Sequence, residues 1–473
     1  MKYVPVIGLE IHCELLTNSK VFCACENSFG GSANVRVCPR CAGLPGTLPV
    51  LNRGSVSLAV KAGLALGCRV NNYSAFDRKN YFYPDLPKAY QITQFASPIC
   101  ENGVVTIKGG KDIRINRIHI EEDAGKLIHD KYENISLADY NRCGVPLIEI
   151  VTEPDFVSAE EVCDFVTETA LRLKYAGVCD ARMEQGSLRV DVNISVMPKG
   201  SDVLGTRAEI KNLNSLKAIT RAIEYETQRQ SETIKSGGIV VQETRRYDDT
   251  KGMTSSMRSK EEARDYRYFP EPDIPPLMLT DKEIISIKNS MPEMPQERFK
   301  RYIAEYKLPE DDARLIIENK AFSDFYDEAV RAYPDYKRVA SLMLVELNRN
   351  LNESKSDMTD IKFSPTDLAR TVRMAKEGVI SKNAAKEIVA IMFQTGCDPE
   401  EIAKTQGFIM SSNAAETESI IDKVLSENNE FVKDYKNGSE KLFGFLMGQV
   451  MRAIGKSANP KIVREILSEK LNN

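Results

Sequence analysis

The chain has 473 residues, enough for about three domains of ordinary size. Its 64 lysines and arginines nearly balance its 68 aspartates and glutamates, so the formal net charge is −4. With 42% hydrophobic and 28% charged residues, the composition excludes a wholly disordered chain. The charge balance excludes a uniformly basic nucleic-acid coat, so any contact with RNA must come from a local basic patch.

The sequence shows no signal for export or for a membrane. No apolar run approaches the roughly 18 residues that span a bilayer. The first residues, MKYVPVIGLEIH, reach Glu10 and His12 too soon for a signal peptide. We therefore expect a cytoplasmic protein without membrane contact, whose 11 cysteines stay as thiols or bind metal.

The first 265 or so residues mix strand patterns with a few helices. Four segments alternate polar and apolar residues, and strand geometry then places the polar side chains of each on one face. These groups are Glu10, His12 and Glu14 in 8–15; His119, Glu121 and Asp123 in 117–123; Arg189, Asp191 and Asn193 in 187–196; and Arg207, Glu209 and Lys211 in 206–214.

Each of these faces alone could be the solvent side of an ordinary antiparallel sheet. Taken together they indicate a site, because two of only three histidines lie among carboxylates. Carboxylate, amide and imidazole groups can hold Mg²⁺ or Mn²⁺, and nearby Arg and Lys can neutralise phosphate. Phosphoryl transfer needs this combination, since its catalysis is mostly metal placement and charge stabilisation.

Four cysteines predict a metal site in residues 23–41. The pairs Cys23-Ala-Cys25 and Cys38-Pro-Arg-Cys41 flank a polar, Gly-rich loop, and two such pairs can supply four thiolates to a tetrahedral Zn²⁺. The alternative, four unligated core cysteines, fits poorly among so many turn-forming residues. The zinc would be structural because the protein fills all four positions, and its loss should unfold the local loop.

The segment 77–91, DRKNYFYPDLPKAYQ, combines cations with tyrosines and prolines. The prolines stiffen the loop, the tyrosines can stack on a base, and Lys88 can reach a phosphate. A packed aromatic turn is the alternative interpretation.

Helical patterns appear at two places in the first half and throughout the second. Ser158 and Glu161 form a capping-box pattern before a helix, and 212–235 forms a second helical stretch. After the proline-rich segment 265–276 the pattern is almost entirely helical, with N-cap and first-turn proline pairs at Ser364-Pro365 and Asp398-Pro399. We place domain boundaries near residues 290 and 407.

The last segment, 408–473, contains a basic stretch at 441–464 that has no Asp or Glu. It is either a contact for RNA phosphates or a solvated helix face balanced by acids upstream. Its cations are Lys441, Arg452, Lys456, Lys461 and Arg464.

Long, ordered motifs in this chain resemble a known family, the B subunit of the bacterial tRNA-dependent aspartyl/glutamyl amidotransferase. The similarity runs almost from end to end. The motifs are GLEIHCEL, FDRKNYFYPDLPKAYQITQF, RIHIEEDAGK, NRCGVPLIEIVTEPD, GSLRVDVNIS, EIKNLNS, QETRRYD and DYRYFPEPDIPPL.

The resemblance implies an α/β (α+β) fold in three parts. A cradle domain with an antiparallel-rich sheet, residues 1–290, would carry the catalytic site and the zinc insert 23–41. An all-α domain, 291–407, and a small all-α tail domain, 408–473, would follow. In this family the tail grips tRNA, which favours the RNA interpretation of the basic stretch.

The resemblance also implies a ligase reaction in a heterotrimer. This subunit would use ATP and Mg²⁺ to phosphorylate the side-chain carboxylate of Glu on tRNA(Gln), or of Asp on tRNA(Asn). Ammonia would then form the amide. The ammonia comes from glutamine hydrolysis in an amidase A subunit, and a small C subunit joins the two. The absence of an amidase serine motif here agrees with that division of labour.

Carried onto this sequence, the resemblance implies two groups of site residues. Glu10, His12, Glu121 and Glu122 would form the catalytic Mg²⁺ site, although Glu122 lies one position off the alternating face and needs a bulge or strand end. Lys88, Asp191, Asn193 and Lys211 would contact ATP or the acceptor end.

A second interpretation is a zinc-dependent RNA-binding module without catalysis of its own. The cysteine pairs and the basic tail fit both. The acidic faces fit only the enzyme, because carboxylates repel RNA phosphates unless a cation intervenes. Whether the acceptor carries Glu, Asp or either cannot be inferred from the sequence.

Overall fold

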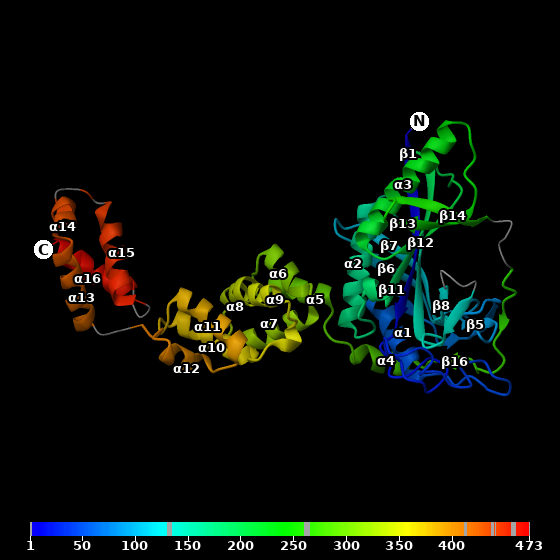
Figure 1. Cartoon of the computed structure of the whole chain (residues 1–473), viewed down its shortest axis with the longest axis horizontal. Helices are drawn as coiled ribbons and strands as arrows, with labels where there is room; N and C mark the ends of the chain where they lie inside the picture. The colour runs from blue at the N-terminus through cyan, green and yellow to red at the C-terminus, as the bar shows by residue number, and fades with distance from the viewer. Residues whose placement is uncertain are drawn as a thin grey trace. The chain divides into compact units, whose positions relative to one another are not determined.

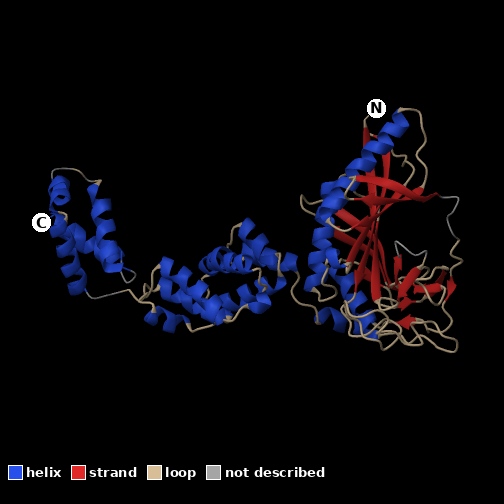
Figure 2. Cartoon of the chain, viewed as in Figure 1, coloured by secondary structure: helices blue, strands red, loops and turns tan. Residues whose placement is uncertain are grey.

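A computed structural model describes residues 2–129, 135–259, 265–410, 414–436, 439, 441–455 and 460–472. The chain divides into two compact units, residues 1–295 and 296–473. Unit 1 contains the sheets and unit 2 is helical (Figures 1 and 2), so the fold class expected from the sequence is confirmed. No helix in the described part of the chain is long and apolar enough to cross a membrane.

Unit 1 is built on a nine-stranded sheet with the order β14-β13-β12-β11-β1-β10-β7-β6-β2. Neighbouring strands are antiparallel except for β12 and β13, which are parallel. The strands are β1 (Tyr3–Glu14), β2 (Arg69–Val70), β6 (Cys100–Thr106), β7 (Asp112–Glu122), β10 (Pro146–Thr152), β11 (Leu188–Pro198), β12 (Ala208–Leu213), β13 (Glu243–Asp248) and β14 (Met253–Ser259).

Three small sheets complete the strands of unit 1. One has the order β15-β4-β5, and the other two are the pairs β16-β3 and β8-β9. Their strands are β3 (Tyr73–Ser74), β4 (Asp77–Asn80), β5 (Tyr90–Thr93), β8 (Lys126–His129), β9 (Ser136–Asp139), β15 (Phe269–Pro270) and β16 (Leu277–Met278).

Three helices pack against one face of the large sheet (Figure 1). They are α1 (Arg53–Ala65), α2 (Ala159–Tyr175) and α3 (Leu216–Lys235), and α4 (Asp281–Asn289) lies beside α1. Ser158 caps α2 as predicted, by accepting a hydrogen bond from the N–H of Glu161. The helix predicted over 212–235 starts later, because residues up to Leu213 belong to β12 and Ser215 caps α3.

The central strand β1 shows why the helices cover only one face. Ile7, Leu9, Ile11 and Cys13 are buried in the core between sheet and helices. The residues between them point to the opposite face, as the alternation of 8–15 predicted. That opposite face carries the polar side chains of the candidate site.

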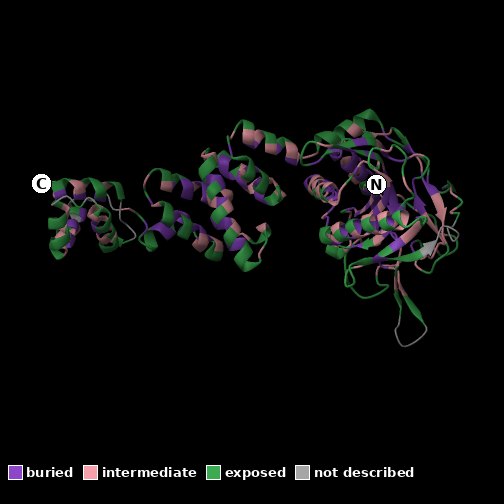
Figure 3. Cartoon of the chain, turned by 90° about the horizontal axis from the view of Figure 1, so that it is seen from above, coloured by how far each residue is buried: buried purple, intermediate pink, exposed green. Residues whose placement is uncertain are grey.

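Unit 2 contains two hydrophobic cores made by separate sets of helices. Figure 3 shows buried residues on the inward side of these helices and exposed ones outside. The first core runs from Tyr302 to Phe408 and the second from Ile421 to Leu471. The expected domain boundary near 407 remains a prediction.

Two helices of unit 2, α10 (Pro365–Lys376) and α12 (Pro399–Thr405), begin where the sequence placed their caps. Ser364 forms a capping box with Asp367 ahead of Pro365, and Asp398 accepts hydrogen bonds from the N–H groups of Glu400 and Glu401. The helices are α5 (Pro295–Ala304), α6 (Glu310–Ile317), α7 (Lys320–Ala332), α8 (Tyr336–Leu342), a π-helical turn (Met343–Leu347), α9 (Asn348–Ser354), α10 (Pro365–Lys376), α11 (Lys382–Thr395), α12 (Pro399–Thr405), α13 (Ala414–Glu427), α14 (Asn429–Lys436), α15 (Leu442–Ile454) and α16 (Pro460–Asn472).

Candidate active site

Strand register brings polar residues from distant segments into rows across the sheet. Opposite His12 on β1 lie Glu149 on β10 and Arg189 on β11, and His119 on β7 lies opposite Glu149. Glu10 lies opposite Asp191 in a neighbouring row. All of these positions share the face away from the helices, so their side chains meet there.

The first cluster joins His12, Glu121 and Glu149. His12 Nε2 lies 3.5 Å from Glu121 Oε1 and 3.6 Å from Glu149 Oε2. His119 Nε2 lies 3.2 Å from the same Glu149 oxygen. The three ligand atoms of the cluster lie within 4.8 Å of one another, close enough to hold one metal ion.

The second cluster joins Glu10, Asp191 and Glu209, again with ligand atoms within 4.8 Å of one another. Lys211 Nζ lies 2.7 Å from both an Asp191 oxygen and a Glu209 oxygen. Asn193 Nδ2 donates a 2.9 Å hydrogen bond to Glu10 Oε1. The structure therefore brings together four of the sequence-predicted residues here: Glu10, Asp191, Asn193 and Lys211.

The pKa values of the carboxyl groups show how strongly these groups act on one another. Burial raises the pKa of Glu121 above its ordinary 4.5, and the charge of Glu149 raises it further. The charges of His12 and His119 act in the opposite direction and lower it. Burial likewise raises the pKa of Glu10, with Glu149 and Glu209 adding to it. Burial would also raise the pKa of Glu149, but the hydrogen bond and charge of His119 hold it well below 4.5.

Buried carboxylates that lie this close together are costly unless positive charge compensates them. A divalent cation would supply it, since bound cations are the largest local charges in such sites and Mg²⁺ prefers oxygen ligands. The donor set of one imidazole and several carboxylates thus fits Mg²⁺ or Mn²⁺ on chemical grounds.

Next to this face, Asp123 is buried between two guanidinium groups. Arg189 Nη2 lies 3.1 Å from Asp123 Oδ1, and Arg142 bonds both Asp123 and Glu14. Burial alone would raise the pKa of Asp123, but the charges and hydrogen bonds of Arg189 and Arg142 lower it below its ordinary 3.8.

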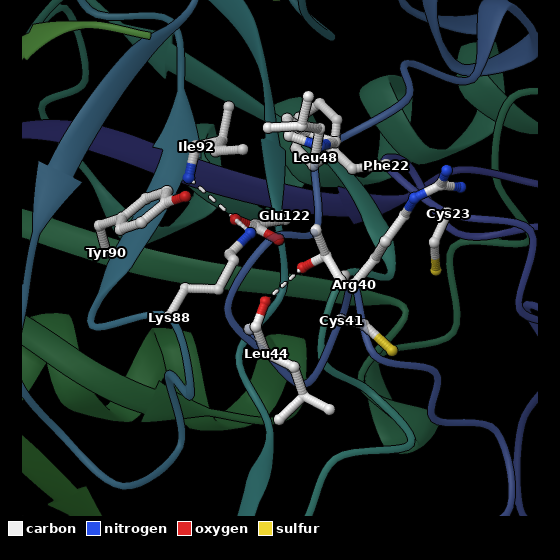
Figure 4. A pocket seen from close by; sticks show the side chains of 14 residues that line it. Phe22, Cys23, Arg40, Cys41, Leu44, Leu48, Lys88, Tyr90, Ile92 and Glu122 are labelled. Atoms are coloured by element: carbon white, nitrogen blue, oxygen red, sulfur yellow. Dashed lines mark hydrogen bonds and ion pairs between the residues drawn. The ribbon is translucent and has the colours of Figure 1, made fainter. Parts of the chain in front are cut away.

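The structure places Glu122 apart from His12 and Glu121. The register of β7 with β10 is continuous through Glu122, so no bulge turns its side chain toward Glu121, but Glu122 is the last residue of β7, the strand end that the expectation also allowed. Glu122 instead forms a short contact with Lys88 Nζ and accepts a 2.9 Å hydrogen bond from the N–H of Ile92 (Figure 4). The metal-binding role expected of Glu122 remains a prediction.

Lys88 and Glu122 lie in a small pocket that the cysteine loop helps to form (Figure 4). The pocket has a volume of about 100 Å³, and Cys23 and Cys41 contribute to its wall. Burial would lower the pKa of Lys88, but the charge of Glu122 raises it. Lys88 is therefore held as a cation by Glu122, away from the two carboxylate clusters.

The four cysteines of 23–41 meet as their spacing predicted. Their sulfur atoms lie within 4.8 Å of one another. The Cys38 N–H donates a 3.1 Å hydrogen bond to Cys41 Sγ, as in a zinc knuckle. The pKa of Cys41 is lowered to about 4, first by a hydrogen bond from Cys23 and then by Cys38 and the charge of Lys20. The geometry suits a tetrahedral Zn²⁺, although zinc itself stays a prediction.

Lys20 is fully buried beside this cluster. Its Nζ lies 3.8 Å from Cys41 Sγ and donates hydrogen bonds to the carbonyl oxygens of Arg36 and Tyr140. In the described part of the chain no carboxylate lies within 4 Å of it. Four thiolates around a Zn²⁺ would carry a net negative charge, and the ammonium of Lys20 beside Cys41 would balance part of it.

The basic stretch of the tail is presented on α15 and α16. Lys441, Arg452, Lys461 and Arg464 are all exposed. Lys456 lies outside the described residues. Exposure is consistent with a contact to phosphates, which stays a prediction.

Sequence reasoning missed one residue of the site, Glu149. It included Lys79 among the cations of 77–91, and it named His119 and Glu209 in the polar faces, without giving these three a role. Glu149 lies in the run LIEIV, which reads as a buried strand; its lone carboxylate was the available signal. Lys79 Nζ lies 4.8 Å from the Tyr266 ring centroid. Burial would lower the pKa of Lys79, but the charges of Glu121 and Glu149 help to raise it.

Comparison with known proteins places this site in a family. Residues 5–285 match the family model described as the GatB/GatE catalytic domain, and residues 324–471 match the GatB domain. Three relatives are named as the B subunit of aspartyl/glutamyl-tRNA(Asn/Gln) amidotransferase, and the alignments cover all of this chain. They come from Ruminiclostridium cellulolyticum (53% identical, 98% of that protein covered), Thermoanaerobacter pseudethanolicus (50%, 100%) and Myxococcus xanthus (46%, 99%).

The chain belongs to this family of amidotransferase B subunits. The resemblance drawn from the motifs is thereby confirmed. Within the region matched by the catalytic-domain model lie both carboxylate clusters, the Lys88–Glu122 pair and the four cysteines.

The zinc site yields a prediction for this member of the family. We expect one tightly bound Zn²⁺ per chain. Replacing Lys20 by Met should lower zinc affinity by about 10- to 100-fold, because the thiolates lose their buried counter-charge. Competition with a chromophoric chelator measures this, and Lys111→Met, at an ion pair with Glu161, is the matched control. Equal zinc affinity in Lys20→Met and wild type would contradict the assignment.

The Asp123 ion pairs predict a pH dependence of stability. Because the folded pKa of Asp123 lies below 3.8, its stabilisation is present above that pH and is lost as the pH falls through the lowered value. Arg142→Met should destabilise unit 1 by about 2 kcal/mol at pH 7. The difference in the free energy of unfolding between this variant and the wild type should shrink as the pH falls toward 3, as measured by scanning calorimetry.

The control for that experiment is Arg69→Met. Arg69 is 68% exposed in its ion pair with Glu101, so its loss should change stability little at any pH. A gap between Arg142→Met and wild type that stays constant from pH 7 to pH 3 would contradict the role given to Asp123.

Proposed function

We propose that this chain is the acceptor-activating subunit of an ATP-dependent, tRNA-dependent amidotransferase. Its substrates would be Glu-tRNA(Gln), Asp-tRNA(Asn) or both, and the overall reaction would be the carbon–nitrogen ligation that yields Gln-tRNA(Gln) or Asn-tRNA(Asn). The observation that carries the proposal is the pair of adjoining carboxylate clusters on the open face of the sheet. The names of the relatives support the substrate class.

The chemistry proceeds in two steps. A side-chain carboxylate oxygen of the tRNA-bound amino acid attacks the γ-phosphorus of ATP, forming an acyl phosphate and releasing ADP. Ammonia then attacks the acyl carbon and phosphate leaves with the C–O bonding electrons. A carboxylate is a poor electrophile, and phosphorylation is needed because phosphate is a far better leaving group.

The residues of the two clusters would hold Mg²⁺ for this reaction: His12, Glu121 and Glu149 in one, and Glu10, Asp191 and Glu209 in the other. When bound, Mg²⁺ neutralises phosphate charge that the carboxylates would otherwise repel. Lys211 is oriented by Asp191 and Glu209, which leaves its ammonium at the rim of the second cluster. It would contact a phosphate there, and Asn193 fixes the orientation of Glu10.

Lys88 and Glu122 form an ion pair at the end of β7, beside the cysteine loop and apart from the two carboxylate clusters. Their buried ion pair beside the cysteine loop fixes the position of that loop relative to β7. Contact of Lys88 with ATP or the acceptor end would require opening this pair. We therefore place Lys211 ahead of Lys88 as the cation that meets phosphate.

The chain would work in a cytoplasmic heterotrimer with an amidase A subunit and a small C subunit. The relatives are named as one subunit of an amidotransferase, which supports assembly into a larger enzyme. The alternative function, a zinc-dependent RNA-binding module, leaves six clustered carboxylate and imidazole side chains without a purpose. The helical tail, 408–473, would grip tRNA and the catalytic domain, 1–290, would perform the activation.

Replacing Glu149 by Gln tests the activation step. In the assembled enzyme with ammonium chloride as nitrogen donor, we expect amide formation and tRNA-dependent ATP hydrolysis to fall by at least about 100-fold. Glutaminase activity and tRNA affinity should stay unchanged, because the variant keeps the shape of the site and the partner subunit.

Glu101→Gln is the matched control, since Glu101 lies on β6 of the same sheet but pairs with Arg69 and belongs to neither cluster. Wild-type rates of amide formation in Glu149→Gln would remove this cluster from the mechanism.

Removal of residues 414–473 tests the tail. This cut leaves Phe408 in its core, and we expect tRNA affinity to fall about tenfold at 150 mM salt while the subunits still assemble. The full-length double variant Arg452→Gln/Arg464→Gln should still assemble. Its plot of log binding constant against log salt concentration should be less steep by about 2, because two phosphate contacts are lost. Filter binding across salt concentrations measures both. A truncated enzyme with undiminished tRNA affinity would refute the role of the tail.

A further inference from the structure

Aromatic side chains from two distant segments meet beside the polar face. Phe95 and Tyr268 stack with ring centroids 4.3 Å apart and planes inclined by 15°. Tyr266 lies edge-on to Tyr268 at 6.1 Å and to Tyr81 at 6.3 Å. Phe95 is 56% exposed, so one face of the stacked pair is open to a ligand.

The backbone holds these rings firmly. The buried carboxylate of Asp77 accepts hydrogen bonds from the N–H groups of Phe95 and Ala96, at 2.8 and 3.0 Å. Asn80 Nδ2 donates to the carbonyl oxygens of Tyr266 and Arg267, at 3.2 and 2.7 Å. An exposed aromatic ring on a backbone fixed in this way is preorganised for contact.

The aromatic residues adjoin the first carboxylate cluster. Gln94, the residue before Phe95, connects the two, because its Oε1 accepts a 2.9 Å hydrogen bond from the N–H of Ile120, which lies between His119 and Glu121 on β7. A ligand stacked on Phe95 would therefore lie next to the reacting groups.

The charge around the rings favours a nucleotide. Arg267 is exposed and has a left-handed backbone with φ of 44°, a conformation that costs energy for a non-glycine residue. Lys79 supplies a cation at these rings, since its Nζ lies 4.8 Å from the Tyr266 ring centroid. Flat rings with neighbouring cations are the arrangement that binds single-stranded nucleic acid, by base stacking and phosphate contact.

We propose that the Phe95–Tyr268 pair is a stacking platform for an adenine base, that of the 3′-terminal adenosine of the acceptor tRNA. This rests on the proposed function, in which the amino acid is esterified to that nucleotide and must reach the carboxylate clusters. The open position of Phe95 suits a chain end that enters and leaves. ATP also carries adenine, so the experiment separates the two sources.

The test uses the assembled enzyme and uncharged tRNA, with and without its terminal adenosine. In the wild type, removal of the adenosine should weaken binding by about tenfold. Phe95→Ala should bind the complete tRNA with that weakened affinity and should not distinguish the two tRNAs. Phe95→Leu, which keeps an apolar side chain without a flat ring, should behave like Phe95→Ala.

Phe29→Ala is the matched control, because Phe29 is 76% exposed and lies in the cysteine loop. It should bind both tRNAs as the wild type does. Two results for Phe95→Ala would overturn the proposal. One is that binding of the complete and the shortened tRNA weakens by the same factor. The other is that the dissociation constant of ATP rises while the variant still distinguishes the two tRNAs. Thermal melting of each variant confirms that the fold is retained.

These binding measurements stand apart from catalysis. If the wild-type enzyme discriminates the terminal adenosine through Phe95 but never phosphorylates the acceptor, the platform is supported and the proposed function fails. If phosphorylation occurs and Phe95→Ala still discriminates, only the platform is overturned.

Discussion

The structure of unit 1 depends on one electrostatic constraint: several carboxylates are crowded on the open face of a sheet whose other face is core. Glu121 and Glu149 lie within contact distance of His12, and Glu10 adjoins Asp191 and Glu209. Grouping these charges away from bulk water is costly unless positive charge compensates them. Burial is the main cause that raises the pKa values of Glu10 and Glu121, and the charge of Glu149 raises both further. This is the physical argument for a divalent cation.

The cysteine loop is bonded to the segment that leads into β10, the strand that carries Glu149. The N–H of Val21 donates to the carbonyl oxygen of Gly144, Lys20 reaches the carbonyl oxygen of Tyr140, and the Cys143 thiol contacts the carbonyl oxygen of Cys41. The segment thus held leads directly into β10, which carries Glu149. A structural zinc would therefore fix the start of a strand that supplies a site residue, rather than an isolated surface loop.

Local patterns in the sequence were enough to predict much of this arrangement. The alternation around Glu10 and His12 follows from strand geometry alone, and the cysteine spacing defines its own cluster. Glu149 could not be assigned in the same way, because only the register of β10 against β1 places it beside His12. Glu122 was expected at a bulge or a strand end; it ends β7 without a bulge, and its carboxylate contacts Lys88. The meeting of Phe95 with Tyr268 depends on long-range pairing of β15 with β4, which no local pattern encodes.

Titration of the assembled enzyme with Mn²⁺, followed by electron paramagnetic resonance, tests the central claim most directly. The account predicts bound Mn²⁺ in the wild type, displaced by Mg²⁺, since the two carboxylate clusters offer oxygen ligands that suit either ion. That binding should be lost in Glu10→Gln/Glu121→Gln. Wild-type protein that binds no Mn²⁺, or a double variant that binds it as tightly, would contradict the account.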